Sequence, residues 1–95
     1  MIEITVGRES IKIRGHAYYA PQGQDIVCAG ITALTQALVS SIEGLTKDKI
    51  QYDIKPGRAD IYYRNLSEKA STLVDSFFIG ASLIADEFPD YVRML

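Results

Sequence analysis

The sequence is poor in the residues that hold small secreted proteins together. Its 95 residues include one cysteine, one histidine and no tryptophan. One cysteine cannot form an internal disulfide, which excludes a disulfide-stapled secreted domain and fits a reducing, cytoplasmic compartment. One cysteine, one histidine and a nearby aspartate are also too few ligands for a closed structural zinc site. We therefore expect a cytoplasmic protein that uses no metal and no other cofactor.

Neither charge nor hydrophobicity is concentrated in one stretch. Ten Lys and Arg residues face twelve Asp and Glu, and the basic residues are scattered, whereas nucleic-acid binding needs a basic stripe. We expect no bilayer-spanning run and no signal peptide, because the first six residues lack a basic region and a long apolar core. Nucleic acids and membranes are therefore not expected partners. With 47% apolar and 23% charged residues, residues 1–95 are predicted to form one globular domain.

The N-terminal region has the pattern of a β-hairpin. Apolar and polar residues alternate over residues 2–6 and again over 11–15, and the polar turn Gly7-Arg8-Glu9-Ser10 separates the two runs. By the same alternation His16 falls on the polar face of the second strand. We therefore expect its imidazole to lie where water reaches it.

A loop and then a helix follow the hairpin. Residues 18–24 have no sustained period, and Gly23 lets their backbone change conformation. From Asp25, the expected N-cap, the period becomes helical, and Gly44 is expected to mark the end of the helix. The apolar positions at spacings of three and four are Val27, Ile31, Leu34, Leu38, Ile42 and Leu45. Nearly every side of this helix is apolar or small, which predicts that it is largely buried.

The second half of the chain repeats the same order of elements. Residues 50–54 and 59–64 read as strands, and the Pro-Gly pair at the centre of Lys55-Pro56-Gly57-Arg58 is typical of a type II turn between them. A second helix and a possible short strand over residues 91–95 follow. The predicted fold class is α+β, a mainly antiparallel sheet built from two hairpins in ββαββα order and covered by two helices.

The second helix has more apolar surface than one contact face needs. Ser67 is its expected N-cap and Pro89 its stop. Its apolar stripe consists of Ala70, Leu73, Val74, Phe77, Ala81, Ile84 and Phe88. Phe78, Ile79 and Leu83 lie beside or beyond that stripe. Because large exposed apolar patches usually mark a partner, the pattern predicts a homodimer through this helix.

The only histidine and the only cysteine flank the loop. If Asp25 caps the helix, Cys28 lies in the first turn, where free N–H groups and the helix dipole favour a thiolate. His16 needs only the loop to fold back for its ring to meet the sulfur. A Cys–His pair can perform covalent acyl transfer, and free N–H groups of the first turn can act as an oxyanion hole.

Other interpretations of the same residues remain open. A lone cysteine in an apolar helix is more often a small core residue, and a lone histidine more often a surface or capping residue. The chain could then be a non-catalytic homodimer that binds a peptide or a ribosomal partner, with Cys28 buried. A thiol redox sensor is a weaker alternative, because no second cysteine is present to resolve a sulfenic acid.

Two short motifs resemble a known family. Residues 15–17, Gly-His-Ala, and residues 23–30, Gly-Gln-Asp-Ile-Val-Cys-Ala-Gly, are similar to the signature of the ribosomal-processing cysteine proteases, the Prp family. The match includes the glycine before the histidine, the Gly-x-Asp before Ile-Val-Cys and the spacing between His16 and Cys28. The rest of the chain agrees in size and element order. Position 32, commonly serine in that family, is Thr32 here, which retains the hydroxyl and adds a methyl group.

The resemblance implies a function and a set of site residues. It implies that His16 and Cys28 form the catalytic dyad of a cysteine endopeptidase. The supporting residues are Gly15, Gly23, Asp25 and Thr32, and the substrate-binding loop carries Tyr18, Tyr19, Gln22 and Gln24. Members of this family remove a short N-terminal extension from one large-subunit ribosomal protein, cutting after an aromatic-containing motif. The resemblance also implies a cytosolic homodimer whose loop moves to admit substrate.

Overall fold

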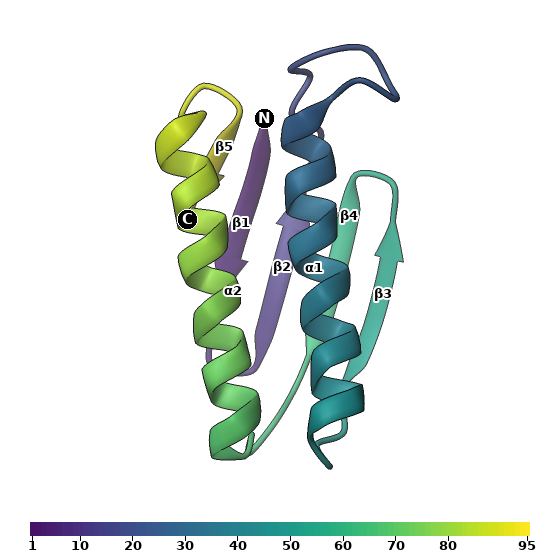
Figure 1. Ribbon diagram of the computed structural model, residues 1–95, viewed down its shortest axis with the longest axis vertical. Helices are drawn as coiled ribbons and strands as arrows, with labels where there is room; N and C mark the ends of the chain where they lie inside the picture. Colours follow the sequence, from purple (N-terminus) through teal and green to yellow (C-terminus); the bar gives the residue numbers. More distant parts are fainter.

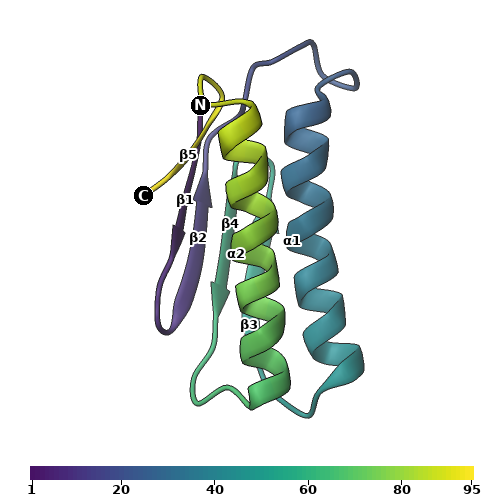
Figure 2. The ribbon, with the colours of Figure 1, turned by 60° about the vertical axis from the view of Figure 1, so that its left-hand side comes forward.

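Both helices of the protein lie on one face of a five-stranded sheet (Figure 1). The computed structural model describes all residues 1–95. Its elements are β1 (Ile2–Val6), β2 (Ser10–Arg14), α1 (Ile26–Leu45), β3 (Gln51–Lys55), β4 (Arg58–Tyr62), α2 (Glu68–Glu87) and β5 (Val92–Met94). The predicted ββαββα order and the closing C-terminal strand are confirmed. Figure 2 shows the two layers from the side, with the helices side by side in front of the strands.

The order of strands across the sheet is β3-β4-β2-β1-β5. All neighbouring strands are antiparallel except β1 and β5, which run parallel. Opposite residues such as Ile4 and Ile13, or Ile13 and Ala59, point to the same side and are buried beneath the helices. The α+β prediction of a mainly antiparallel sheet covered by two helices is therefore confirmed.

Helix α1 begins as the sequence predicts, but it is less buried. Asp25 is its N-cap, and the helix continues through Gly44 to Leu45, with Thr46 as C-cap. Its buried residues are Val27, Ile31, Thr35, Leu38, Val39 and Ile42. The prediction of a largely buried helix is wrong, because α1 contacts the sheet along one side and its alanines and Ile26 face outward.

The length and composition of α1 also correct the expectation that no segment could span a bilayer. By these two criteria alone the helix is long and apolar enough to do so. A core helix of a globular protein passes the same test. Here Ile31, Leu38 and Ile42 pack in the core with the strands, so the apolar side of the helix is used for packing on the sheet.

Helix α2 follows its predicted limits. Ser67 caps it through a hydrogen bond from the N–H of Ala70 to its hydroxyl oxygen (3.2 Å), and the helix stops before Pro89. Its buried residues are Ala70, Val74, Phe77 and Ala81. Phe78, Ile79 and Leu83 are exposed, as the sequence pattern predicts.

Candidate active site

Three consecutive residues after β2 each take part in one hydrogen bond to a distant part of the chain. These bonds run from the N–H of Gly15 to the carbonyl of Gly57 (2.9 Å), from the amino group of Met1 to the carbonyl of His16 (2.7 Å), and from the N–H of Ala17 to Sγ of Cys28 (3.3 Å). The backbone around His16 is thus tied to the β3–β4 turn, to the N-terminus and to α1. The last bond brings the chain next to His16 directly against the thiol.

His16 lies on a different side of the sheet from the one that strand alternation predicts. The strand ends at Arg14, and Gly15 has a φ of 93°, a conformation that favours glycine. A Cβ on Gly15 would clash with the Met1 carbonyl oxygen. The reversal at Gly15 ends the alternation, so the imidazole joins Cys28 in the cavities beside α1. The prediction that the histidine is exposed to water is confirmed.

Asp25 connects the start of α1 to the loop. One carboxylate oxygen accepts from the N–H groups of Val27 (3.0 Å) and Cys28 (2.9 Å), and the other accepts from the N–H of Tyr19 (3.0 Å). Burial of Asp25 opposes its ionisation, but the hydrogen bonds from Cys28 and Tyr19 outweigh it and hold the pKa of this carboxyl below its ordinary value. The N–H groups of Val27 and Cys28 therefore bond to Asp25, and these two first-turn donors are not free for the oxyanion hole that the sequence suggests for that turn.

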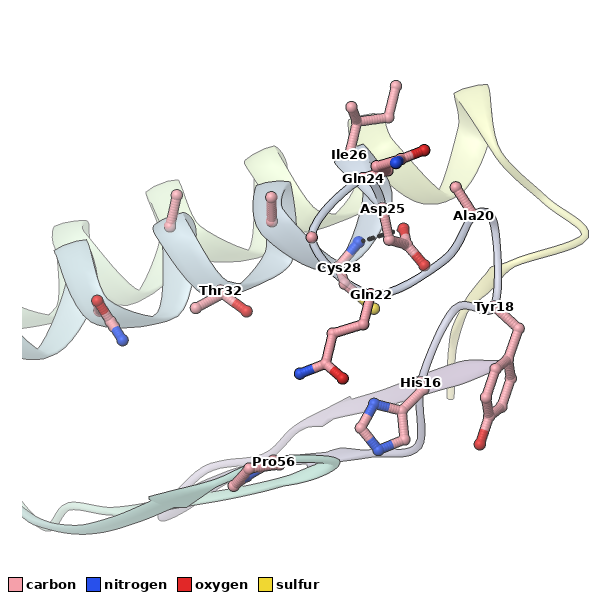
Figure 3. Close-up of a pocket in the computed structure, with 14 residues that line it drawn as sticks. His16, Tyr18, Ala20, Gln22, Gln24, Asp25, Ile26, Cys28, Thr32 and Pro56 are labelled. Carbon is pink, nitrogen blue, oxygen red and sulfur yellow. Dashed lines mark hydrogen bonds between the residues drawn. The ribbon is translucent and has the colours of Figure 1, made fainter.

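Two adjoining cavities meet at the histidine and the cysteine. One has a volume of about 870 Å³ and lies between the loop and the start of α1, and the other, of about 400 Å³, lies between α1 and the β3–β4 hairpin. His16 and Cys28 line both. Figure 3 shows the imidazole opposite the first turn of α1, with Gln22 between them. Neither ring nitrogen is hydrogen-bonded to Sγ in this structure, and Cys28 is half-buried.

The remaining predicted site residues fall into two groups. Tyr18, Gln22, Gly23, Gln24, Asp25 and Thr32 line the larger cavity, and Gly15 and Thr32 line the smaller one. Tyr19 is not among the lining residues, because its ring packs edge-on against Phe88 and Tyr91. Its side chain therefore fastens the loop to the C-terminal end of α2 instead of facing the cavity.

The β3–β4 hairpin forms a further side of the site that no local sequence signal predicts. Pro56 lines both cavities, and Ile54 and Gly57 line the smaller one. These residues come from the β3–β4 hairpin, which is distant in sequence from both His16 and Cys28. The Pro-Gly pair indicated a turn, but only the pairing of β4 with β2 places that turn beside the histidine.

The comparisons with known proteins agree with this geometry. A family model described as cysteine protease Prp matches residues 1–93. The ribosomal processing cysteine protease Prp of Bacillus subtilis is 27% identical over 107 residues, covering 99% of this chain and 96% of the relative. The Staphylococcus aureus protein of the same name is 29% identical over 100 residues, covering 98% and 94%.

Solved structures share the fold over nearly the whole chain. One is a crystal structure of the essential ribosomal processing protease Prp from S. aureus with a covalently linked product peptide; it has a TM-score of 0.88 and 25% identity, covering 98% of this chain and 94% of the other. The structure of SMU.848 from Streptococcus mutans has a TM-score of 0.81 and 30% identity, covering 99% and 91%.

Proposed function

Because this chain belongs to the cysteine protease Prp family, we propose that it removes a short N-terminal extension from the precursor of a large-subunit ribosomal protein. Cys28 is the nucleophile and His16 the general base and acid. The observation that carries the proposal is that these two side chains, the only ones of their kind, line the same two cavities at the start of α1. The solved structure of the S. aureus relative with a covalently linked product peptide supports covalent peptide chemistry.

The reaction follows the chemistry of a Cys–His pair. His16 takes the proton of the thiol, and Sγ of Cys28 attacks the scissile carbonyl carbon to give a tetrahedral intermediate. The imidazolium then protonates the departing amine, which leaves an acyl-enzyme. A water molecule, deprotonated by His16, hydrolyses that thioester and restores the thiol.

The backbone N–H of Ala17 is a hydrogen-bond donor next to the reacting sulfur. This N–H donates a hydrogen bond to Sγ of Cys28 at 3.3 Å. The oxyanion of the tetrahedral intermediate forms on the carbon that is bonded to Sγ, and we propose that the same N–H donates to the developing charge there. In the proposal this donor takes the place of the first-turn N–H groups of Val27 and Cys28, which bond to Asp25.

The other site residues support the dyad in the proposal. Asp25 holds the start of α1 and the loop together, and Thr32 presents its hydroxyl in the cavity one turn beyond Cys28. The loop residues Tyr18, Gln22 and Gln24 contact the peptide. We also propose that residues 1–95 act as one protease domain, as a homodimer in the bacterial cytoplasm, where the thiol stays reduced.

Cleavage of a peptide that copies the N-terminal extension of the ribosomal protein tests the proposal. We expect wild type to cut one bond, identified by mass spectrometry, and Cys28→Ala to lose at least about 1000-fold in kcat/KM. His16→Ala is expected to lose about 100- to 10,000-fold. Ser40→Ala, an exposed change on α1 outside both cavities, serves as the matched control with full activity. Wild-type cleavage by a folded Cys28→Ala would refute the mechanism.

The non-catalytic binding module is tested by the same samples. A binding module would hold the peptide without cutting it, and its cysteine would react slowly with iodoacetamide. That alternative needs a buried Cys28, whereas Cys28 is only half-buried and lines the larger cavity, which favours the protease.

A further inference from the structure

We infer that Gly57, in the turn between β3 and β4, is a positioning residue that seats the imidazole of His16; this inference rests on the proposed function. A Cβ placed on Gly57 would lie 2.6 Å from Nε2 and 3.2 Å from both Cδ2 and Cε1 of His16. Cδ2 and Cε1 are the two ring atoms that flank Nε2, so this edge of the ring rests against the α-carbon of Gly57. Glycine alone leaves that space free, since every other residue carries a Cβ.

The backbone of the turn independently requires glycine at this position. Gly57 has a φ of 74° and follows Pro56, the arrangement of the two central residues of a type II turn. The turn is closed by the paired residues Lys55 and Arg58. The tight turn therefore requires glycine at position 57. The same glycine places an α-carbon without a side chain against the histidine.

Gly57 holds the histidine through the main chain as well. Its carbonyl oxygen accepts the hydrogen bond from the N–H of Gly15, at 2.9 Å. Gly15 precedes His16. Gly57 therefore contacts both the backbone next to the histidine and the far edge of the imidazole ring. An exposed side chain is otherwise free to change rotamer within nanoseconds. These two contacts restrict the imidazole to the side of the cleft that Cys28 also lines.

The contact of the His16 ring with Gly57 determines which ring nitrogen faces the thiol. Nε2 is the ring atom closest to the added Cβ position, and Figure 3 shows one ring nitrogen directed toward the turn that carries Pro56 and the other toward Gln22 and Cys28. Nδ1 is therefore the nitrogen presented to the cleft. Because a misplacement of about 1 Å can cost roughly 100-fold in rate, a side chain at position 57 should impair proton transfer more than peptide binding.

Two substitutions separate the contact with the ring from the strain of the turn. Gly57→Ala introduces a Cβ and an unfavourable positive φ, whereas Gly57→Asn introduces the Cβ in a residue that tolerates positive φ. Both are expected to lower kcat by about 10- to 100-fold, with KM changed less than about 3-fold. A folded Gly57→Asn with the kcat of wild type would overturn the inference.

The matched control places the same backbone strain elsewhere. Asn65, which has a φ of 51°, is exposed in the connection between β4 and α2 and lines neither cavity. Asn65→Ala should lower Tm as a positive-φ alanine does and leave kcat unchanged. If Asn65→Ala loses as much activity as Gly57→Asn, the loss of activity comes from lower stability. The positioning of His16 by Gly57 is then refuted.

A direct measurement on wild type needs neither a variant nor catalysis. Nuclear Overhauser effects between the ring protons of His16 and the α-protons of Gly57 are expected, and their absence would overturn the inference even if the Gly57 variants fail to fold. If these contacts are present but wild type cuts no peptide, the contact between Gly57 and the His16 ring is confirmed and the proposed function fails. The two conclusions can therefore fail separately.

Discussion

The side chain of Asp25 accepts hydrogen bonds from three different residues of the site. Its two carboxylate oxygens bind N–H groups of the first turn of α1 and of the loop. One side chain therefore sets both where the helix begins and where the loop lies. It bonds to the N–H of Cys28 at 2.9 Å and so fixes the backbone of that residue.

Substitution of Asp25 should affect stability and activity together. Asp25→Ala removes the cap and is expected to cost about 1 kcal/mol in the free energy of unfolding, within a usual range of about 0.5–2. Asp25→Asn, which can still cap a helix, should recover most of that loss. Urea unfolding and peptide cleavage measure the two effects. Equal stability of Asp25→Ala and wild type would contradict the capping role.

The pH dependence of this contribution has a definite sign. The folded-state pKa of Asp25 lies below its ordinary value of 3.8. A lowered pKa contributes stability that is fully present above 3.8 and is lost as the pH falls through the folded-state value. The difference in stability between wild type and Asp25→Ala should therefore be constant near neutral pH and narrow below about pH 4.

Among the elements, the loop before α1 has few hydrogen bonds from its main-chain N–H groups. Its hydrogen-bonded main-chain N–H groups include those of Tyr19, bound by Asp25, and of Gln24, bound by the Pro21 carbonyl. The side chain of Tyr19 packs against Phe88 and Tyr91 at one end. The loop is thus anchored at its two ends, and Gln22 and Gly23 lie between them.

We expect this segment to exchange its amide hydrogens rapidly and to be protected by substrate. Amides without a hydrogen-bonded partner exchange from states near zero free energy, while a bound peptide would order them. Hydrogen exchange with mass spectrometry on Cys28→Ala, with and without the uncut peptide, measures this. Helix α1 after Thr32 serves as an internal control. Identical exchange of residues 18–24 in both samples would argue against a gating loop.

A buried carboxylate organises the face of the sheet that carries no helix. Asp60 alternates with the buried Ala59 and Ile61, yet it is only 4% exposed because Arg14 and Arg58 cover it, with distances of 2.7 and 3.1 Å. The hydrogen bond from Arg14 is the main reason that the pKa of Asp60 lies below its ordinary value, against the opposing effect of burial. The pair with Arg14 also links β4 to β2, the strand that leads to His16.

Asp60→Ala is expected to destabilise the fold by about 2 kcal/mol, the usual effect of losing charged hydrogen bonds whose partners can return to water. The loss should shrink below about pH 4, because a lowered pKa contributes stability only while the group is ionised. Asp53→Ala is the matched control: its pair with Lys55 is exposed, so a change below about 0.5 kcal/mol is expected in urea unfolding. Similar losses for both variants would contradict the special role of Asp60.

At the scale of the whole molecule, the outer surface of the helix layer is the main apolar feature. On α2, Ile79 is 61% and Leu83 63% exposed, with Phe78 beside them. These side chains point away from the sheet that the same helix covers. An apolar area of this kind on a small chain supports the proposed homodimer.

Sedimentation measures the dimer directly. We expect wild type to sediment as a dimer at micromolar concentration and Leu83→Glu to shift it toward monomer, because a charge would be buried at the interface. Ser71→Glu, exposed near the other end of α2, should leave the dimer intact. A wild-type monomer at working concentration would remove this part of the proposal.

The sequence by itself determined the elements and the chemistry-bearing residues. The alternation of the strands, the caps Asp25 and Ser67, and the Pro56-Gly57 turn are local signals, because each depends on neighbours within one turn or one hairpin. The same holds for the pairing of the only histidine and the only cysteine across one loop. These features require no knowledge of which distant segments meet.

Only the tertiary structure decided how these parts combine. The parallel pairing of β5 with β1, the contact of Tyr19 with Tyr91, and the approach of Gly57 to His16 all join residues far apart in the chain. The free energy of such contacts depends on burial and on steric fit between segments, for which the local pattern carries no information. The orientation of His16 is the clearest case, since one positive φ at Gly15 overrides the strand pattern and directs the ring to Gly57 and the cleft.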